Sequence, residues 1–466
     1  MREGVGHPYI GKGVISAGDE ESRAVSSLNA DRAVGAQAVE VTYYFSVDHD
    51  GSPMQGLLNA AKMVLEHGTL KSWHNEGDPG VQKPSGYDSF MSWATGLRLH
   101  DHGPGWEAGL ATIAYPLEFF DKRDDRRFPL SQLLMAVASE PSTAFSFYRA
   151  AKIVEVKFPP SLRDRFPGVR WPHDRVRAYL ELDPDEPIIG TIVKPKTGLT
   201  PELFSRSVVE AARAGARFTK ADENMHLTLR EVSQYVGRVT RDLRAAGFDL
   251  ARTGKARGKR FLFAPHITTD PDRMESYARA ALDAGANALM FSPYYSGGFL
   301  SMASLIEKFD VPVYAHTAGM NVMTGSPGWG IDSRVMYVLA ALFGAAFMQL
   351  TTMGGYLRPT DEEKPEILRA LRENGLEGRK GMTLAIAGGM GPKVIGKNMQ
   401  VLGEEGRMFL AGTSVYSHPD GPSSGVKALI GAYKAYKSEH ITEIEALRSY
   451  ARGLGGDEGR ALERSL

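Results

Sequence analysis

The residues best suited to chemistry form a short charged run at 218–224, Phe-Thr-Lys-Ala-Asp-Glu-Asn. Asp222 and Glu223 supply adjacent carboxylates, and carboxylate oxygens are the ligands that a hard cation such as Mg²⁺ prefers. Lys220 stands two residues before them, and as an ammonium group it would repel a metal ion. It fits a metal site only as a counter-ion, or after its amine has become a carbamate. The same spacing also occurs in ordinary solvated loops, so its meaning depends on the elements that position it.

A second charged run precedes the first, at 190–196, Gly-Thr-Ile-Val-Lys-Pro-Lys. Both runs follow a short apolar segment, which predicts that each lies at the end of a buried strand. Charged groups crowded at such a position are costly unless they are paired or hold an ion. Lys194 and Lys196 are therefore candidates to act together with the residues at 220–223.

A regular alternation of short apolar segments and helical patterns places these two runs. Short, mostly apolar strands are typical of parallel sheets that are covered on the outside. Eight strand–helix units predict a (β/α)8 TIM barrel, and their regularity favours it over a doubly wound open sheet. The expected strands are 188–193, 216–220, 260–265, 288–292, 312–316, 346–350, 383–387 and 407–411. The expected helices are 201–214, 229–246, 271–284, 300–309, 333–343, 361–374, 393–402 and 421–436.

Active sites of such barrels lie at the C-terminal ends of the strands. Two glycine-containing segments follow the seventh and eighth expected strands, where backbone N–H groups often hold a phosphate. One glycine alone could mark a simple turn, but two such segments at matching positions favour a phosphate cradle. In chain order, the residues at the expected strand ends are Lys194, Lys196, Lys220, Asp222, Glu223, His266, Ser292, His316, Thr351, Thr352, Gly388, Gly389, Gly412, Thr413 and Ser414.

The preceding part of the chain predicts a separate α+β domain of the ferredoxin-like kind at 38–158. Its strands are expected at 39–47, 110–115 and 151–158, and its helices at 54–66 and 130–138. Residues 1–37 are polar and lack a clear period, so an irregular or partly ordered extension is expected there. The barrel domain is expected at 159–440 and a helical tail at 441–466.

Composition excludes several classes of function. The 466 residues contain 55 Lys and Arg against 55 Asp and Glu, which gives no electrostatic reason for binding nucleic acid or a membrane. The absence of cysteine excludes disulfides, zinc–thiolate sites, iron–sulfur clusters and a thiol nucleophile. Residues 1–13 show no apolar segment of a signal peptide, and the longest apolar stretch, at about 335–350, is too short to cross a membrane. A soluble, cytoplasmic protein is expected.

Four motifs resemble those of the RuBisCO large-subunit superfamily. Residues 190–199 resemble its first-strand motif and residues 218–224 its metal-binding motif. Residues 387–389, Ala-Gly-Gly, resemble its seventh-strand Ser-Gly-Gly, and residues 412–421 its glycine-rich loop with the His-Pro-x-Gly that follows. The resemblance runs from about residue 39 to 440. It implies that Mg²⁺ is held by Lys220 (as a carbamate, formed with CO₂), Asp222 and Glu223, and that Lys220 is also catalytic, because a carbamate is basic enough to take a proton from a carbon next to a carbonyl.

The resemblance also implies roles for other residues at the strand ends. Lys194 would handle the proton of an enolate oxygen or carbon, with Lys196 as its supporting partner. His316 would contact a substrate hydroxyl, although it could also be a buried histidine of the core. The phosphate cradle would consist of Gly388, Gly389, Gly412 and Thr413.

Several departures from the family pattern indicate a changed chemistry. Carboxylating members carry a lysine in the loop after the sixth strand, but residues 351–356 contain none. The fifth-strand His-Arg-x-x-His is reduced to His316, and Met348 replaces the sixth-strand histidine. In the N-terminal domain, Glu140 aligns with a substrate-contacting asparagine. Residues 70–73, ending in Trp73, align with a Thr-x-Trp stretch, with Glu66 or His67 in place of its acid.

This combination is similar to the RuBisCO-like proteins of form IV. It implies a Mg²⁺-stabilised enolate formed from a phosphorylated ketose or a related sugar-acid phosphate, with isomerisation or tautomerisation and no CO₂ fixation. A decarboxylase or transcarboxylase of a 3-oxo sugar-acid phosphate is one alternative, and a non-catalytic binding or stress-related protein is another. The family also implies a homodimer, or a multiple of dimers, without a small subunit. Trp73 and Glu140 would then act across the interface, unless they are packing or surface residues of their own domain.

Overall fold

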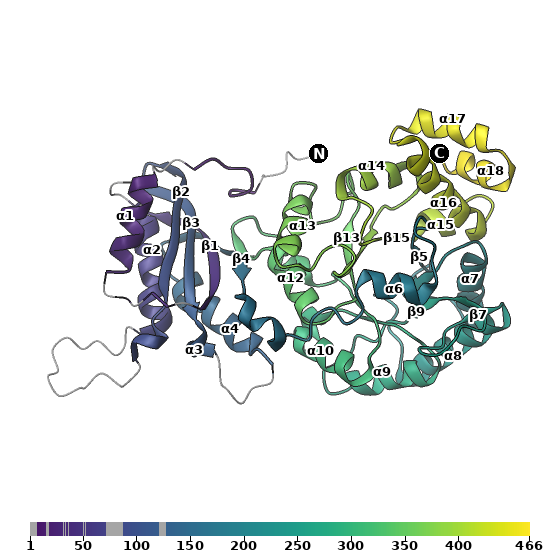
Figure 1. The fold of residues 1–466 in the computed structure, drawn as a ribbon, viewed down its shortest axis with the longest axis horizontal. Helices are drawn as coiled ribbons and strands as arrows, with labels where there is room; N and C mark the ends of the chain where they lie inside the picture. Colours follow the sequence, from purple (N-terminus) through teal and green to yellow (C-terminus); the bar gives the residue numbers. More distant parts are fainter. Residues whose placement is uncertain are drawn as a thin grey trace. The chain divides into compact units, whose positions relative to one another are not determined.

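The structure, a computed structural model, describes residues 7–14, 18–30, 32, 34–35, 37–49, 51, 53–70, 87–120 and 127–466. The chain divides into two compact units. The N-terminal unit comprises Met1–Phe166 together with Met320–Met336. The barrel unit comprises Pro167–Gly319 and Tyr337–Leu466. Figure 1 shows both units along the chain.

The N-terminal unit is built on a five-stranded sheet with the order β12-β4-β1-β3-β2 (Figure 1). β1, β3, β2 and β4 pair in antiparallel fashion, and their apolar residues form a buried face. The Tyr43 and Tyr115 hydroxyls meet at 2.7 Å on this face, and the Tyr43 hydroxyl also donates to the Val137 carbonyl at 2.9 Å. The strands are β1 (Ala38–Asp48), β2 (Trp93–Gly103), β3 (Trp106–Pro116), β4 (Tyr148–Lys157) and β12 (Trp329–Ile331). The helices are α1 (Gly18–Leu28), α2 (Gln55–Leu65), α3 (Leu117–Phe120), α4 (Leu130–Val137), α5 (Glu140–Thr143) and α11 (Met320–Thr324).

Several features of this unit were not expected, among them the strand β2. The extension, expected to be irregular or partly ordered, contains the helix α1, which packs against β2, and Asn29 exchanges hydrogen bonds with the backbone of Ala94. The segment 320–336, expected to belong to the barrel domain, supplies β12, a parallel edge strand on β4. The buried Lys152 ammonium holds this segment by donating to the carbonyls of Thr324 and Ser326. Both contacts join residues far apart in sequence, so no local pattern announces them.

The barrel unit contains the eight expected parallel strands, in the order β10-β11-β13-β14-β15-β5-β6-β9. The ring closes through a bridge between His266 and Met290, where Met290 N donates to the Pro265 carbonyl and Ile267 N to the Met290 carbonyl. The strands are β5 (Ile189–Ile192), β6 (Phe218–Lys220), β9 (Leu262–Ala264), β10 (Leu289–Phe291), β11 (Val313–Ala315), β13 (Phe347–Thr351), β14 (Thr383–Ala387) and β15 (Arg407–Ala411). A separate pair, β7 (Phe248–Asp249) and β8 (Lys259–Arg260), precedes β9.

Helices surround these strands, as Figure 1 shows. Thr200 caps α7 through the Leu203 N–H, and Thr228 and Glu231 form a capping box on α8. α9 was expected to begin at Pro271 but begins at Met274, which leaves the Asp270 side chain outside the helix. The surrounding helices are α7 (Pro201–Arg213), α8 (Leu229–Ala245), α9 (Met274–Asp283), α10 (Gly298–Phe309), α12 (Ser333–Leu342), α13 (Glu363–Glu373), α14 (Pro392–Leu402), α15 (Thr413–Tyr416) and α16 (Pro422–Glu439). The expected helical tail consists of α17 (Ile444–Leu454) and α18 (Gly456–Ser465).

The interior of the barrel is a packed apolar core. Phe218, Tyr314 and Phe347 stack against one another inside the ring. α6 (His173–Leu180) contributes Val176 and Leu180 to the same core. The core therefore fixes the strands, and with them the positions of the side chains that follow each strand. Within the described ranges, no helix is long and apolar enough to span a membrane.

His173, at the start of α6, makes the barrel sensitive to acid. Its ring is buried, and its Nδ1 lies 3.0 Å from the Thr383 hydroxyl on β14. Burial, with smaller contributions from nearby arginines, lowers the pKa of His173 to about 4. The folded pKa lies below that of an unfolded histidine, so the unfolded chain binds more protons between these values. Stability is therefore complete above about pH 6.5 and falls as the pH drops towards 4.

We expect this one histidine to remove roughly 3 kcal/mol of stability over that interval. Thermal unfolding midpoints at about pH 7 and pH 4 measure the effect. His173→Gln should shrink the difference between the two midpoints, whereas the exposed control His102→Gln should leave it unchanged. An equal acid shift in wild type and His173→Gln would contradict the assignment.

Candidate active site

Lys220 is the last residue of β6, and its side chain is fully buried. Its Nζ lies 5.6 Å from the centre of the Tyr314 ring on β11 and 3.5 Å from Glu223 Oε2. Burial lowers the pKa of Lys220 to about 8, although the charges of Glu223 and Asp222 oppose the shift. About a tenth of the amine is therefore neutral at pH 7, far more than for a lysine of ordinary pKa, and only a neutral amine can react with CO₂.

Asp222 is paired with the lysine that follows β5. Lys194 Nζ donates to Asp222 Oδ2 at 2.5 Å, and both the backbone and the side-chain nitrogen of Asn224 donate to Oδ1 at 3.1 Å. Burial alone would raise the pKa of Asp222, but these donors outweigh it and hold the pKa below its ordinary value. β5 and β6 are neighbours in the sheet, which is why the two charged runs of the sequence meet.

Glu223 is held from across the barrel mouth by His316, which follows β11. The Ala318 N–H donates to His316 Nδ1 at 3.0 Å, so the ring proton lies on Nε2. Nε2 is 3.3 Å from Glu223 Oε2 and donates to it. Burial opposes ionisation of Glu223, but this hydrogen bond and the charge of Lys220 hold its pKa well below the usual range. Burial and the same lysine also lower the pKa of His316, which keeps the ring neutral.

These residues fit a divalent cation on one condition. Among the residues that the structure describes, no three His, Asp or Glu side chains converge in a metal-binding group. Asp222 and Glu223 therefore need a third oxygen donor, and the buried Lys220 amine becomes one only as a carbamate. Its lowered pKa and its place beside Glu223 suit that modification. Both carboxylates are ionised: Lys194 pairs with Asp222, and His316 donates a hydrogen bond to Glu223. Ionised carboxylates are the expected ligands of a hard cation.

Two consecutive glycines follow β14, and their geometry excludes other residues. Gly388 and Gly389 have φ of +76° and +88°, which side chains rarely adopt. A Cβ on Gly388 would lie 2.6 Å from a methyl carbon of Leu357, and one on Gly389 would lie 4.0 Å from the ring of Tyr356. The Thr352 hydroxyl donates to the Gly388 carbonyl. The loop after β13 thus lies against the glycine pair.

The glycine segment after β15 lies beside both the β14 segment and Lys194. A Cβ on Gly412 would lie 3.1 Å from Lys194 Cε, so this glycine leaves room for the lysine. Thr413 begins α15, and the Ser414 hydroxyl donates to the Met390 carbonyl at 2.7 Å. The two glycine segments are therefore adjacent, and they lie next to the strand that carries Lys194.

The structure brings most of the expected site residues together, but not all of them. Lys194, Lys220, Asp222, Glu223 and His316 form one cluster. Lys196 is exposed and makes no hydrogen bond or ion pair with any residue of the described ranges. Trp73 lies within 71–86, outside the described residues. The pairing of Lys194 with Asp222 and of His316 with Glu223 could not be predicted from the sequence, because the choice of partner at a barrel mouth depends on three-dimensional geometry.

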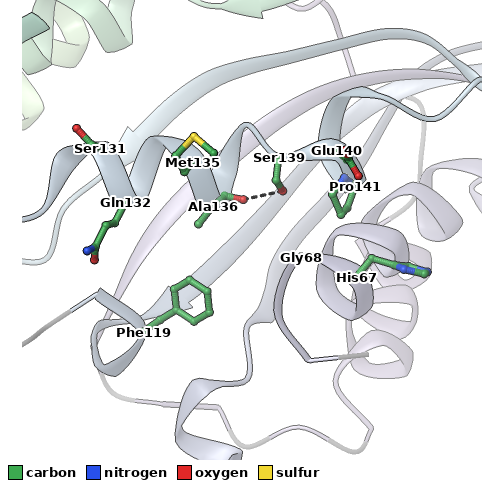
Figure 2. A pocket seen from close by; sticks show the side chains of 10 residues that line it. All are labelled: His67, Gly68, Phe119, Ser131, Gln132, Met135, Ala136, Ser139, Glu140 and Pro141. Atoms are coloured by element: carbon green, nitrogen blue, oxygen red, sulfur yellow. Dashed lines mark hydrogen bonds between the residues drawn. The ribbon is translucent and has the colours of Figure 1, made fainter. Parts of the chain in front are cut away.

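Glu140 lies in the N-terminal unit, on a separate pocket of about 700 Å³. Figure 2 shows Glu140 and His67 at this pocket, with Phe119 and Met135 among its other lining residues. Glu140 begins α5, and the preceding Ser139 hydroxyl donates to the Ala136 carbonyl (Figure 2). Glu140, which aligns with a substrate-contacting asparagine, and His67, one of the two candidates for the position of the family's acid, therefore line the same pocket of this unit.

Comparison with known proteins gives a consistent result. Residues 175–454 match the family model described as the ribulose bisphosphate carboxylase large chain, catalytic domain. A ribulose bisphosphate carboxylase of Methanocaldococcus jannaschii is 26% identical over 74% of this chain and 83% of that protein. A 3-oxo-isoapionate-4-phosphate decarboxylase of Rhizobium rhizogenes is 27% identical over 76% and 83%. A 2,3-diketo-5-methylthiopentyl-1-phosphate enolase of Microcystis aeruginosa is 28% identical over 70% and 79%.

Solved structures share the fold. The octameric Rubisco of Pyrococcus horikoshii matches with a TM-score of 0.74 and 22% identity, covering 94% of each chain. The dimeric archaeal Rubisco of Hyperthermus butylicus matches with a TM-score of 0.73 and 23% identity, covering 92% of this chain and 96% of that one. Both similarities extend over the barrel and the N-terminal sheet, which confirms the predicted architecture.

Proposed function

The chain belongs to the family of the ribulose bisphosphate carboxylase large chain, and from that premise we propose that it is a Mg²⁺-dependent enolising enzyme. Its substrate would be a phosphorylated ketose or a related sugar-acid phosphate, and the outcome isomerisation or tautomerisation without CO₂ fixation. The observation that carries the proposal is the cluster of Lys194, Lys220, Asp222 and Glu223 beside the two glycine segments. It places acid–base groups and backbone N–H groups at one end of the barrel.

Lys220 as a carbamate, Asp222 and Glu223 would hold the Mg²⁺ ion. When bound, such an ion supplies Lewis-acid chemistry, which lowers the cost of negative charge on a substrate oxygen. Lys194 is partly exposed at the mouth, and its ammonium group can hold or donate a proton at that oxygen. His316 orients Glu223 through its Nε2–H, and the glycine segments bind the phosphate through backbone N–H groups.

The loop after β13 supports chemistry without carboxylation. A new carboxylate would need a positive charge nearby, but residues 351–356 offer Tyr356 instead of a lysine at this loop. The loop is also tied down: Asp361 accepts from the Gly354 N–H, and the buried Lys364 donates to the Thr352 carbonyl at 2.7 Å. Lys364 is therefore committed to the loop backbone and does not face a substrate.

We further propose that the active unit is a homodimer or a multiple of dimers. In it, the N-terminal unit of one protomer would complete the barrel site of the other. The solved structures with this fold include proteins described as dimeric and octameric. Glu140, on the pocket of Figure 2, and Trp73 would then contact the substrate from the partner side.

A second candidate, a decarboxylase or transcarboxylase of a 3-oxo sugar-acid phosphate, is favoured by one observation. A relative with 27% identity is named as such a decarboxylase. The same enolate arises when a 3-oxo acid loses CO₂ and when a ketose loses a proton, so one cluster can serve either reaction. The third candidate is a non-catalytic protein. The presence of all three residues of the metal-binding motif, Lys220, Asp222 and Glu223, argues against it.

Deuterium exchange separates these readings. The purified chain is incubated in D₂O with Mg²⁺ and bicarbonate, together with a panel of ketose phosphates and 3-oxo sugar-acid phosphates. We expect C–H exchange on a ketose phosphate without CO₂ release. Release of CO₂ from an oxo-acid would establish the second candidate, and inertness towards the whole panel would support the third. Labelled product formed from ribulose bisphosphate and ¹⁴CO₂ would contradict the prediction that the chain does not carboxylate this substrate.

A further inference from the structure

A small polar cavity lies beside the cluster, at the ends of β6, β9 and β10. It has a volume of about 330 Å³, near the lower limit for pockets that hold small molecules, so it fits part of a ligand. Its lining includes polar groups from the connections that follow β6 and β9 and from α9: His226, His266, Thr268, Thr269, Asp270 and Tyr277. None of these residues is in the metal-binding set or the glycine segments.

His266 is the buried polar group of this cavity, with 7% of its surface exposed. Its Nδ1 lies 3.2 Å from the Met225 carbonyl, and since a carbonyl only accepts, Nδ1 carries the proton. Its Nε2 has no hydrogen-bond partner among the residues described by the structure. Burial lowers the pKa of His266 to about 4, with nearby positive charge acting in the same direction. Nε2 is therefore an unused acceptor.

The other lining groups are also available to a ligand. Asp270 does not cap α9, which begins at Met274, and its carboxylate has no partner in the described part of the chain. The same holds for the Thr269 hydroxyl. The Thr268 hydroxyl accepts from the Ser292 N–H at 2.9 Å, and the Tyr277 hydroxyl accepts from Arg273 at 3.3 Å. Each of these two hydroxyls can still donate its own proton.

The strand order sets the position of this cavity relative to the rest of the site. The sequence of neighbours β14-β15-β5-β6-β9 puts the glycine segments on one side of Lys194 and Lys220, and the cavity on the other. A substrate with its phosphate in the glycine segments and its reactive carbon at the lysines would extend towards His266. We propose that the cavity binds the hydroxyl-bearing end of the substrate's carbon chain, opposite its phosphate, an inference that rests on the proposed enolising function.

The lining chemistry selects hydroxyl groups over a second anion. His266 Nε2 and the Asp270 carboxylate are acceptors, and a hydroxyl can donate to either. A phosphate or carboxylate would place like charge beside Asp270, which is unfavourable. Threonine and tyrosine hydroxyls complete the set by donating to the oxygen of the same substrate group. The cavity therefore favours a hydroxyl-bearing chain end over a second anionic group.

The test compares two probes that differ by one hydroxyl, D-ribulose 1-phosphate and 5-deoxy-D-ribulose 1-phosphate. Calorimetry on the full chain with Mg²⁺ and bicarbonate should give a dissociation constant at least about tenfold lower for the first probe, because a site built for a hydroxyl leaves polar groups unpaired without it. His266→Phe, Thr269→Val and Asp270→Asn should each reduce this preference several-fold and change the affinity for the deoxy probe by less than about twofold. Thr269 is half-exposed, so its isosteric variant keeps the test valid if His266→Phe does not fold.

A matched control distinguishes the cavity from the phosphate cradle. Gly389→Ala should weaken both probes equally, because it alters the end of the substrate that the two probes share. Equal binding of the two probes by wild type, binding of neither, or a preference that survives all three variants overturns the proposal. If wild type shows the preference but catalyses no C–H exchange, the cavity stands and the proposed function fails. If exchange occurs without the preference, the proposed function stands and the cavity assignment fails.

Discussion

Lys220→Ala is expected to abolish Mg²⁺-dependent turnover, with a loss of about 10⁴-fold or more in kcat/KM, or roughly 5 kcal/mol of transition-state stabilisation. The reason is the composition of the ligand set. Asp222 and Glu223 alone offer two carboxylates, and in the proposed site the third donor would come from Lys220 after its amine has reacted with CO₂. The side chain is fully buried, so no neighbouring lysine from the surface can take its place. Turnover rates measured with and without Mg²⁺ give the effect.

A spectroscopic readout separates this role from a structural one. With ¹³C-bicarbonate, wild type should show a carbamate carbon signal that Lys220→Ala and the charge-preserving Lys220→Arg both lack. Because the amine must be neutral to react and its pKa is about 8, the signal should grow as the pH rises from about 7 to 9. Lys380→Ala, which removes an exposed lysine, is the matched control and should keep both signal and activity. Turnover that survives in Lys220→Arg would sink the carbamate assignment.

The barrel could be predicted from the sequence because each of its strands leaves a local signal. β14 and β15 have the expected bounds, and the other barrel strands differ from expectation by one or two residues at most ends. Each strand is a short apolar run between the end of a helix and a polar loop. This pattern is visible in the local sequence, without knowledge of tertiary contacts. The predicted start of α9 was wrong. Asp270-Pro271 resembles the beginning of a helix, but it forms a turn in which Arg273 N donates to the Asp270 carbonyl.

The N-terminal unit contains the elements that could not be predicted. β12 is three residues long, and only its pairing with β4, far away in the chain, makes it a strand. β2 carries His100, Asp101 and His102 near its end and has two register shifts, which break the alternation of apolar residues. α1 is amphipathic but short, and its partner is β2. In each case, the stabilising contact lies outside the segment itself.

The composition of the candidate site was accessible from the sequence, whereas its internal pairing was not. The strand–helix units can be counted along the sequence, and this count identifies the residues at the C-terminal end of each strand. Lys194, Lys220 and His316 could therefore be placed at one rim of the barrel. The direction in which each side chain turns there depends on neighbours from several strands. The His316–Glu223 hydrogen bond crosses the mouth, and Lys196 is exposed and takes part in none of these pairs although it lies two residues from Lys194. The cavity at His266 was missed for the same reason.

Lys194→Met is expected to reduce kcat by about 10³-fold while KM changes little, because a positioned acid–base group contributes about 10²–10⁴-fold to a proton transfer. Methionine keeps the length of the side chain and removes only the ammonium group. The Asp222 carboxylate then loses its donor at 2.5 Å. Its pKa should rise towards the ordinary value, and its Oδ2 becomes free for a cation.

The apparent Mg²⁺ affinity of Lys194→Met should therefore stay equal to wild type or increase, although the variant is nearly inactive. A residue that served only to hold the site together would show the opposite, a loss of Mg²⁺ affinity in parallel with kcat. Lys196→Met is the matched control: it removes an equivalent charge two residues away, from an exposed side chain without a hydrogen bond or ion pair to any described residue, and its effect on kcat should be much smaller. If Lys194→Met retained more than about a tenth of the wild-type kcat, the proton at the substrate oxygen would have to be handled by another group of the rim.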